Sequence, residues 1–131
     1  MDVRYGDLDP QGHLNSASYL TFVESARLGY LTHLGLWPGG SFYDIGVILA
    51  DAHLTYIAQI MFRQKIQVGA RVTRLGNKSL AMEHCLVEAG SEANLATCKT
   101  VLVAYDYRTD QTISIPDHWR QTIAAFEELT D

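Results

Sequence analysis

The stretch SASYLTFVESARLGYLTHLG, residues 16–35, decides the fold. Its apolar residues recur at intervals of three and four, the period of a helix with one broad apolar face. They are Tyr19, Phe22, Val23, Ala26, Tyr30, Leu31 and Leu34. Asn15 or Ser16 is a good N-cap, and Gly35 is a natural C-terminal stop. The pattern predicts a long helix ending near His33 or Leu34 that buries one side against another element.

The chain changes period after this helix. Apolar residues alternate with more polar ones, as in half-buried strands, in segments 48–56, 66–72 and 80–86. Residues 93–107 carry β-branched and aromatic side chains on both faces, which is typical of a central strand. Short turns between these segments favour antiparallel hairpins. We therefore expect four long antiparallel strands.

Two shorter elements flank this region. Residues 2–5 alternate as a first short strand, and Pro116 opens a C-terminal helix in which Trp119, Ile123 and Phe126 share a face. One helix cannot cover itself, and a curved sheet has one face to bury. The sequence predicts an α+β domain, an antiparallel sheet of about five strands wrapped around one long helix. The length of 131 residues predicts a single domain over 1–131.

Composition excludes several classes of protein. The net charge of −5 argues against a general nucleic-acid binder, because no positive field would gather phosphates. No apolar run approaches the ~18 residues of a membrane span, and the N-terminus lacks a signal-peptide pattern. Cys85 and Cys98 show no CxxC or metal-ligand spacing. We expect no disulfide and a cytoplasmic protein.

Charge is unevenly distributed along the chain. Residues 52–82 contain no carboxylate but hold half of the ten Lys and Arg residues, namely Arg63, Lys65, Arg71, Arg74 and Lys78. Two interpretations are open. The cations protect strand edges, as is common in sheet proteins, or they form a local patch for an anionic small molecule such as a phosphate-bearing cofactor.

The densest polar cluster precedes the long helix and comprises Asp7, Asp9, His13 and Asn15. A helix N-terminus offers free backbone N–H groups and the positive end of the dipole. A carboxylate beside such donors suits a base or nucleophile, while the N–H groups polarise a carbonyl oxygen. The alternative is an Asx-turn in which these side chains only satisfy loop amides and cap the helix.

The string YGDLDPQGHLN, residues 5–15, followed by Tyr19 and by ESAR at 24–27, resembles the signature of a known family. It is similar to the hotdog-fold acyl-CoA thioesterases of the 4-hydroxybenzoyl-CoA thioesterase-like family, which carry D-x-D-x-x-G-H-x-N before the central helix. The resemblance continues at lower specificity over nearly the whole chain. It implies a hotdog fold and an acyl-CoA thioesterase activity.

Carried over residue by residue, the resemblance implies that Asp9 is the catalytic carboxylate, as general base or as nucleophile. The backbone N–H near Ser16 would hydrogen-bond the thioester oxygen. His13 and Asn15 would shape the loop and touch substrate or water. This chain has Asn15-Ser16 where relatives often have Asn-Asn, and residues 58–67 lack a proline and an acidic residue common in relatives.

Other contacts of the expected substrate follow from charge. We expect Arg63, Arg74 and Lys78 to hold the phosphates of coenzyme A, with Ser79 as a structural or ligand-contacting residue. Neither a metal-ligand cluster nor a GxGxxG fingerprint occurs, so no cofactor is implied. Exposed edge strands and the resemblance together predict a homodimer or homotetramer with its active site at the subunit interface.

Hydrolysis of an acyl-CoA thioester is therefore the leading hypothesis. One alternative keeps the fold but changes the chemistry, to a hydratase or dehydratase acting on an enoyl or hydroxyacyl thioester. A second alternative is a non-catalytic protein that binds acyl thioesters. The acyl group is not predicted, although Trp37, Phe42 and Tyr43 are candidates for lining its pocket.

Overall fold

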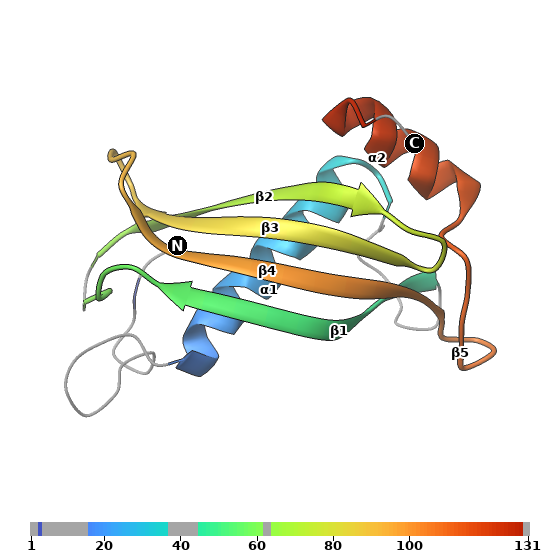
Figure 1. The fold of residues 1–131 in the computed structure, drawn as a ribbon, viewed down its shortest axis with the longest axis horizontal. Helices are drawn as coiled ribbons and strands as arrows, with labels where there is room; N and C mark the ends of the chain where they lie inside the picture. The colour runs from blue at the N-terminus through green and yellow to red at the C-terminus, as the bar shows by residue number, and fades with distance from the viewer. Residues whose placement is uncertain (1–2, 4–15, 37–44, 62–63, 130–131) are drawn as a thin grey trace.

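The computed structural model describes residue 3 and residues 16–36, 45–61 and 64–129 of the chain. Two helices and five strands lie within these residues (Figure 1). In chain order they are α1 (Ser16–His33), β1 (Ile45–Tyr56), β2 (Ile66–Leu75), β3 (Ser79–Glu88), β4 (Asn94–Asp106), β5 (Gln111–Thr112) and α2 (Asp117–Glu127). The predicted α+β class and the four long strands are confirmed.

The strands form one antiparallel sheet in the order β1-β4-β3-β2, with β5 paired to β4. The strand predicted to be central, β4, lies between β1 and β3. Among the described residues the fifth strand is β5, which the sequence does not predict, and the strand predicted at residues 2–5 lies almost wholly outside the described residues. Of that segment the structure describes only Val3, whose N–H donates to the Gln64 carbonyl at 3.1 Å.

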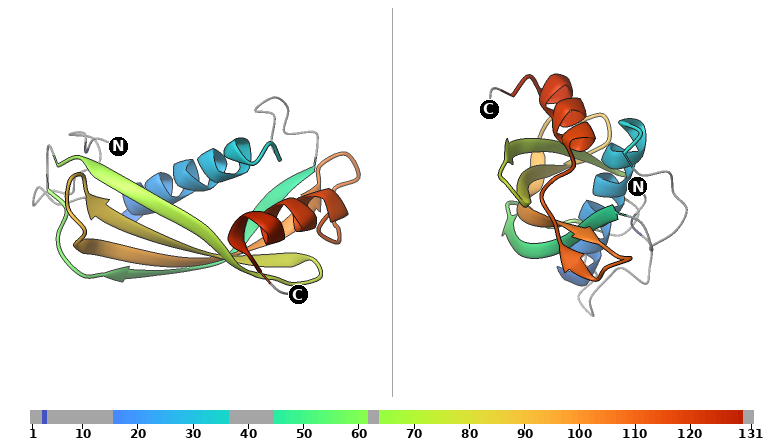
Figure 2. Two further views of the ribbon diagram at one scale, coloured as in Figure 1. Left: turned by 90° about the horizontal axis from the view of Figure 1, so that it is seen from above. Right: turned by 90° about the vertical axis from the view of Figure 1, so that its right-hand side faces the viewer.

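Helix α1 packs on one face of the sheet (Figure 2). We call this the inner face and the opposite one the outer face. The predicted apolar side of α1 is the buried one, since Tyr19, Val23 and Leu31 are all at most 5% exposed. The helix ends at His33, and Gly35 follows with a φ of +71°, a left-handed conformation that glycine adopts at low cost.

The core consists of two apolar clusters along the inner face. One surrounds the first half of α1 and comprises Val3, Tyr19, Phe22, Val23, Ile60, Ile66, Leu86, Ala96 and Cys98. The other lies at the opposite end of the sheet, where α2 joins it, and includes Tyr30, Leu31, Val72, Leu80, Met82, Leu102, Trp119 and Ile123. Each cluster combines helix and strand residues, so burial at both ends fixes α1 on the sheet.

A bulge in β1 changes the alternation that the sequence predicts. The register shifts between Leu49 and Asp51. Before the bulge, Leu49 pairs with the buried Leu102, whereas Ile48 pairs with Val103 on the outer face. After it, Leu54 pairs with the buried Cys98. Unbroken alternation from residue 48 to residue 56 would put Ile48 on the same face as Leu54, but the extra residue of the bulge places Ile48 on the outer face and Leu54 on the inner face.

Helix α2 covers part of the free edge of β2. Pro116 precedes it, and Trp119 and Ile123 are buried as predicted. Phe126 differs, being 51% exposed with its ring against Tyr30 at a centroid distance of 5.8 Å. One Glu127 carboxylate oxygen accepts hydrogen bonds at 2.8 Å from both the Tyr30 hydroxyl and the Val72 N–H. This carboxylate therefore occupies an edge position where another strand would otherwise pair.

Both cysteines are free thiols, as the sequence predicts. Cys85 points to the outer face and Cys98 is buried on the inner face, so the sheet separates them. Among the described helices, none is both long and apolar enough to cross a bilayer.

Candidate functional site

The N-terminus of α1 is the structural centre of the predicted site. The helix begins at Ser16, and its first turn carries no acidic residue. Its first N–H groups have no partner within the helix, and its dipole places partial positive charge there. Any anion or polarised carbonyl oxygen at this position would be stabilised.

A buried apolar cluster that includes Tyr19, Phe22 and Val23 lies against the first half of α1. Ser18 and Tyr19 are buried, and the Tyr19 ring meets the ring of Tyr56, at the end of β1, edge to face at a centroid distance of 5.0 Å. Burial raises the pKa of Tyr19, and the Tyr56 phenol raises it further. Electrostatic interactions are stronger beside buried groups such as Ser18 and Tyr19 than in bulk water. The start of α1 is thus suited to stabilising developing negative charge.

Several predicted site residues lie outside the described part of the chain. These are Asp9, His13, Asn15 and Arg63, together with the loop aromatics Trp37, Phe42 and Tyr43. Ser16 is described as the first residue of α1. The roles assigned to these residues stay predictions.

The remaining predicted residues lie at the far end of β2. Arg74 and Lys78 are exposed, and Ser79 is half-buried at the start of β3. The turn between the strands is fixed by α2, because the Arg120 guanidinium donates to the Gly76 carbonyl at 2.7 Å. The structure thus brings these three residues together beside α2.

The described cations of the acid-free stretch do not form one patch. Lys65 precedes β2 and Lys78 follows it, and ten strand residues place them about 30 Å apart. Arg71, between them, donates to the Glu83 carboxylate at 2.9 Å. Glu83 lies just beyond the acid-free stretch in sequence but is directly opposite Arg71 in the β2–β3 register. Pairing across strands therefore neutralises a cation that looks unpaired in the sequence.

The structure adds a polar layer that sequence reasoning missed. His84 on β3 and Thr100 on β4 are 3% and 2% exposed, and they separate the two apolar clusters. Arg27 lies at the same level on α1, between Val23 and Tyr30. Nδ1 of His84 and Nε of Arg27 are buried without a hydrogen-bond partner among the described residues. The sequence did contain a signal for this layer. His84 takes an inward position of its strand, between the apolar Met82 and Leu86.

Electrostatics keep this layer singly charged. Burial, and secondly the charge of Arg27, lower the pKa of His84 to about 4, so its imidazole is neutral at pH 7. Burial also lowers the pKa of Arg27, and the charge of Glu24 opposes this change. The layer carries one cation, on Arg27, inside the helix–sheet interface.

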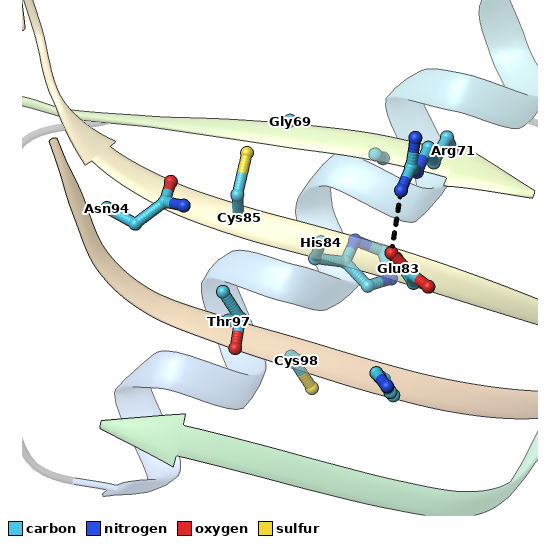
Figure 3. A pocket seen from close by; sticks show the side chains of 10 residues that line it. Gly69, Arg71, Glu83, His84, Cys85, Asn94, Thr97 and Cys98 are labelled. Carbon is cyan, nitrogen blue, oxygen red and sulfur yellow. Dashed lines mark hydrogen bonds and ion pairs between the residues drawn. The ribbon is translucent and has the colours of Figure 1, made fainter. Parts of the chain in front are cut away.

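A hollow of about 450 Å³ lies on the outer face, away from α1 (Figure 3). Its floor is formed by small residues of β2, β3 and β4, including Gly69, Cys85 and Thr97, and the Arg71–Glu83 pair borders it. The sheet separates this hollow from the inner face, so it does not belong to the site at the start of α1. No cluster of three or more metal-ligating side chains occurs within the described residues.

Comparison with known proteins identifies the family to which the chain belongs. A model of the thioesterase-like superfamily matches residues 3–123. The chain belongs to the thioesterase-like superfamily. The match includes the polar motif before α1 and continues into α2, so the family spans nearly the whole sequence.

Solved structures share both the thioesterase-like fold and part of the sequence. A thioesterase from Thermus thermophilus, complexed with coenzyme A and Zn, is 31% identical with a TM-score of 0.83, covering 99% of this chain and 93% of that one. The PA5185 protein from Pseudomonas aeruginosa is also 31% identical, with a TM-score of 0.84 and coverage of 95% and 87%. The uncharacterized protein YsmA of Bacillus subtilis is 21% identical over 123 residues, 94% of this chain and 82% of that protein.

Proposed function

We propose that this protein hydrolyses an acyl-CoA thioester to a free acid and coenzyme A. The observation that carries the proposal is the start of α1 at Ser16, on an apolar cluster and directly after the motif that contains Asp9. Membership of the thioesterase-like superfamily supports thioester hydrolysis. The 31% identical Thermus thermophilus thioesterase, complexed with coenzyme A, supports coenzyme A as the leaving group.

In the proposed mechanism the thioester carbonyl oxygen accepts a hydrogen bond from the backbone N–H near Ser16. Asp9 acts as general base on a water molecule or attacks the carbonyl carbon itself. In the first route Asp9 takes a proton from the water, the water oxygen bonds to the carbonyl carbon, the C–S bond breaks, and the sulfur of coenzyme A leaves with the electron pair and takes up the proton held by Asp9. In the second route the attack of Asp9 expels the coenzyme A thiolate, which takes up a proton from solvent, and leaves a mixed anhydride. Water then hydrolyses this anhydride to the free acid and regenerates Asp9. The positive end of the α1 dipole stabilises the oxyanion between these events. His13 and Asn15 hold the loop and contact substrate or water.

Substitution of Asp9 tests the assignment. Asp9→Asn preserves shape but removes the charge, so turnover is expected to fall ~10²–10⁴-fold, as for loss of a general base. Thiol release from acyl-CoA measures turnover, and circular dichroism verifies folding. Asp117→Asn, at the exposed start of α2, is the matched control and is expected to keep full activity. A folded Asp9→Asn protein with near-normal turnover would remove Asp9 from the mechanism.

A panel of aromatic, short-chain and long-chain acyl-CoA esters would identify the acyl group. The same panel separates the two rival functions. Loss of enoyl absorbance without thiol release indicates a hydratase or dehydratase, and saturable binding without turnover indicates a binding protein. Free thiol release above the uncatalysed rate supports hydrolysis.

We further infer a homodimer formed through the free edge of β1. In the described residues β1 pairs with β4 on one side and with no strand on the other. Large apolar side chains are exposed on β1 and on the neighbouring flank of α1, namely Leu20, Ile48, Leu49 and Tyr56. The edge of β2 is less available, because Glu127 and α2 occupy it. Pairing of identical β1 edges around a two-fold axis buries this surface and extends the sheet.

An antiparallel β1 pair also brings the two halves of the proposed site to one end of the dimer. Within one chain, the start of α1 lies beside the end of β1, whereas Arg74 and Lys78 lie at the opposite end of the sheet (Figure 1). Two-fold pairing reverses one protomer, so the Lys78 end of one chain shares an end of the dimer with the α1 start of the other. The active site would then lie at the subunit interface, with the sheet wrapped around α1 in a hotdog arrangement.

Light scattering tests this dimer. Leu49→Lys places a charge at an apolar inward position of β1 that is 48% exposed, and it is expected to weaken association at least tenfold. Thr109→Lys, in the exposed turn before β5, is the control. A wild-type chain that runs as a stable monomer at micromolar concentration contradicts the dimer. We place the protein in the cytoplasm, where its free thiols would stay reduced.

A further inference from the structure

Three elements each place one polar side chain at the boundary between the two apolar clusters. They are Arg27 on α1, His84 on β3 and Thr100 on β4. On α1, which crosses the inner face of the sheet (Figure 2), Val23 belongs to one cluster and Tyr30 to the other, with Arg27 between them. His84 and Thr100 are almost fully buried. Their polar atoms cannot turn to solvent, so they need partners inside the protein.

Two polar atoms of this layer have no partner among the described residues. His84 uses Nε2, which lies 3.5 Å from the Thr100 hydroxyl oxygen, and its Nδ1 is unpartnered. Of the three guanidinium nitrogens of Arg27, only Nε is both buried and unpartnered. One of the two atoms therefore belongs to the helix and the other to the sheet.

The two atoms are complementary as hydrogen-bonding groups. Burial, and secondly the charge of Arg27, lower the pKa of His84 to about 4, and the second effect requires the guanidinium to lie near the imidazole. At pH 7 the neutral imidazole has one N–H and one lone pair. The nearby positive charge favours the tautomer with the lone pair on Nδ1, in which Nε2–H donates to the Thr100 hydroxyl. Because Nε–H of Arg27 is only a donor, the helix offers a donor and the sheet an acceptor.

A water molecule satisfies such a pair. It accepts a hydrogen bond from Nε–H of Arg27 and donates one to Nδ1 of His84, whereas an anion has no hydrogen to donate to Nδ1. The residues directly opposite His84 in the sheet are Ala70 on β2 and Cys98 on β4. Both side chains are small, so no long neighbour on these strands fills the space beside the imidazole.

We propose that one buried water molecule joins Nε of Arg27 to Nδ1 of His84 and that this bridge positions α1 on the sheet. The apolar clusters hold α1 by contacts that have no preferred direction, whereas a hydrogen-bonded bridge favours one register of the helix. Arg27 is eleven residues after Ser16, about 16 Å along the helix. Arg27 and His84 are therefore positioning residues, which act on the start of α1 only through the placement of the helix.

A crystal structure at high resolution tests the bridge directly. We expect a water molecule within about 2.7–3.2 Å of both Nε of Arg27 and Nδ1 of His84. Direct contact between the two nitrogens, or no density between them, overturns the proposal. So does an ion at this position, which soaking with bromide would reveal as an anomalous peak.

Two substitutions of His84 differ in whether they keep the acceptor. His84→Asn sets its side-chain oxygen near the position of Nδ1, because both atoms are bonded to Cγ. His84→Leu has the same branched shape but no acceptor. The water molecule is expected in crystals of His84→Asn and not in crystals of His84→Leu. Its presence in both variants would show that Nδ1 does not hold it.

Urea unfolding at pH 8, where His84 is neutral, measures the coupling between the two residues. Arg27→Leu and His84→Leu each leave one buried partner of the water unsatisfied, whereas the double variant removes both. The folding equilibrium constant of the double variant is therefore expected to exceed the value from multiplying the two single losses by at least about fivefold.

Arg27→Leu combined with His53→Leu, at an exposed position on β1, is the matched control and is expected to show no coupling. Losses that multiply in both pairs overturn the bridge. If Arg27→Leu does not fold, the crystal structure of the wild type decides.

Thiol release from acyl-CoA tests the positioning role, and this test rests on the proposed function. His84→Leu is expected to lower kcat severalfold with KM near wild type, because substrate still binds while the helix start is displaced from the carbonyl oxygen. His84→Asn is expected to recover most of this loss, which a general loss of packing would not allow. Equal kcat in folded His84→Leu and wild type removes the positioning role. A wild type that releases no thiol contradicts the proposed function instead, and the bridge is still decided by the crystal structure and by unfolding.

Discussion

His84 couples the stability of this protein to pH. Burial and the charge of Arg27 lower the pKa of His84 to about 4 from an ordinary value near 6.5. The unfolded chain therefore takes up a proton at a higher pH than the folded protein. Stability contributed by neutral His84 is complete above about pH 6.5 and is lost as the pH falls toward 4.

His84→Gln removes this titration. Between pH 7 and pH 5 the wild type is expected to lose about 2 kcal/mol more unfolding free energy than the variant. Urea unfolding at the two values measures both proteins, and His53→Gln, at an exposed position on β1, is the control. Parallel stability profiles for wild type and His84→Gln would show that His84 is protonated as easily in the folded protein as in the unfolded chain.

The contacts of Glu127 predict a larger loss of stability for one substitution than for another. Its carboxylate accepts hydrogen bonds from Tyr30 and from the backbone of Val72, and burial together with the Glu127 contact raises the pKa of Tyr30. Glu127→Ala leaves both donors without a partner and is expected to destabilise by about 1–3 kcal/mol. Glu127→Gln keeps an acceptor oxygen and is expected to cost less. Denaturant unfolding ranks the two variants, and equal losses would mean that the acceptor contributes nothing.

At the scale of elements, the packing of β2 on β3 depends on a glycine. A Cβ added at Gly69 would lie 2.9 Å from the Cys85 sulfur, closer than side chains tolerate. Gly69→Ala is therefore expected to destabilise by about 1–3 kcal/mol through overpacking. Cys85→Ala removes the obstructing sulfur, so the double variant is expected to be more stable than the two single losses would sum to. Thermal unfolding at fixed protein concentration measures the three variants. If the loss in the double variant equals the sum of the two single losses, the strain does not arise between residue 69 and the Cys85 sulfur.

Sequence periodicity predicted the elements well because each long element has one buried side. The helix at 16–33 and the four long strands each repeat their apolar residues at the period of their own backbone. The bulge at Leu49–Asp51 was not predictable, because one extra residue changes which side chains face the helix without changing the amino-acid composition of the strand. The two-residue strand β5 was missed for a related reason. It is defined by pairing with Tyr105 and Asp106 and carries no pattern of its own.

Across the whole molecule, the charges were the least predictable feature. The motif around Asp9 could be proposed from sequence because its residues are contiguous. The pairing of Arg71 with Glu83 depends on strand register, which composition does not encode. The separation of Lys65 from Lys78 depends on the length of β2. Cations that are close in sequence are therefore separated in the fold. Lys65 and Lys78 lie at opposite ends of β2, and Arg71 between them is paired with Glu83.

This division of charge leads to a prediction about coenzyme A. The protein has a net charge of −5, so a substrate with several phosphate charges needs a local cationic contact. Arg74 and Lys78 are exposed beside one fixed turn and are the proposed contact. Arg74→Ala and Lys78→Ala are each expected to raise KM for acyl-CoA severalfold while kcat stays near wild type, because the phosphates lie far from the reacting carbonyl.

A truncated thioester without the nucleotide separates phosphate binding from folding effects. Its KM is expected to be the same in wild type, Arg74→Ala and Lys78→Ala, and added salt is expected to weaken only the binding of full acyl-CoA. Lys65→Ala is the matched control, a cation of the same acid-free stretch at the other end of β2. If Arg74→Ala and Lys78→Ala change both substrates equally, or neither, these cations protect the ends of the strands and the phosphates bind elsewhere.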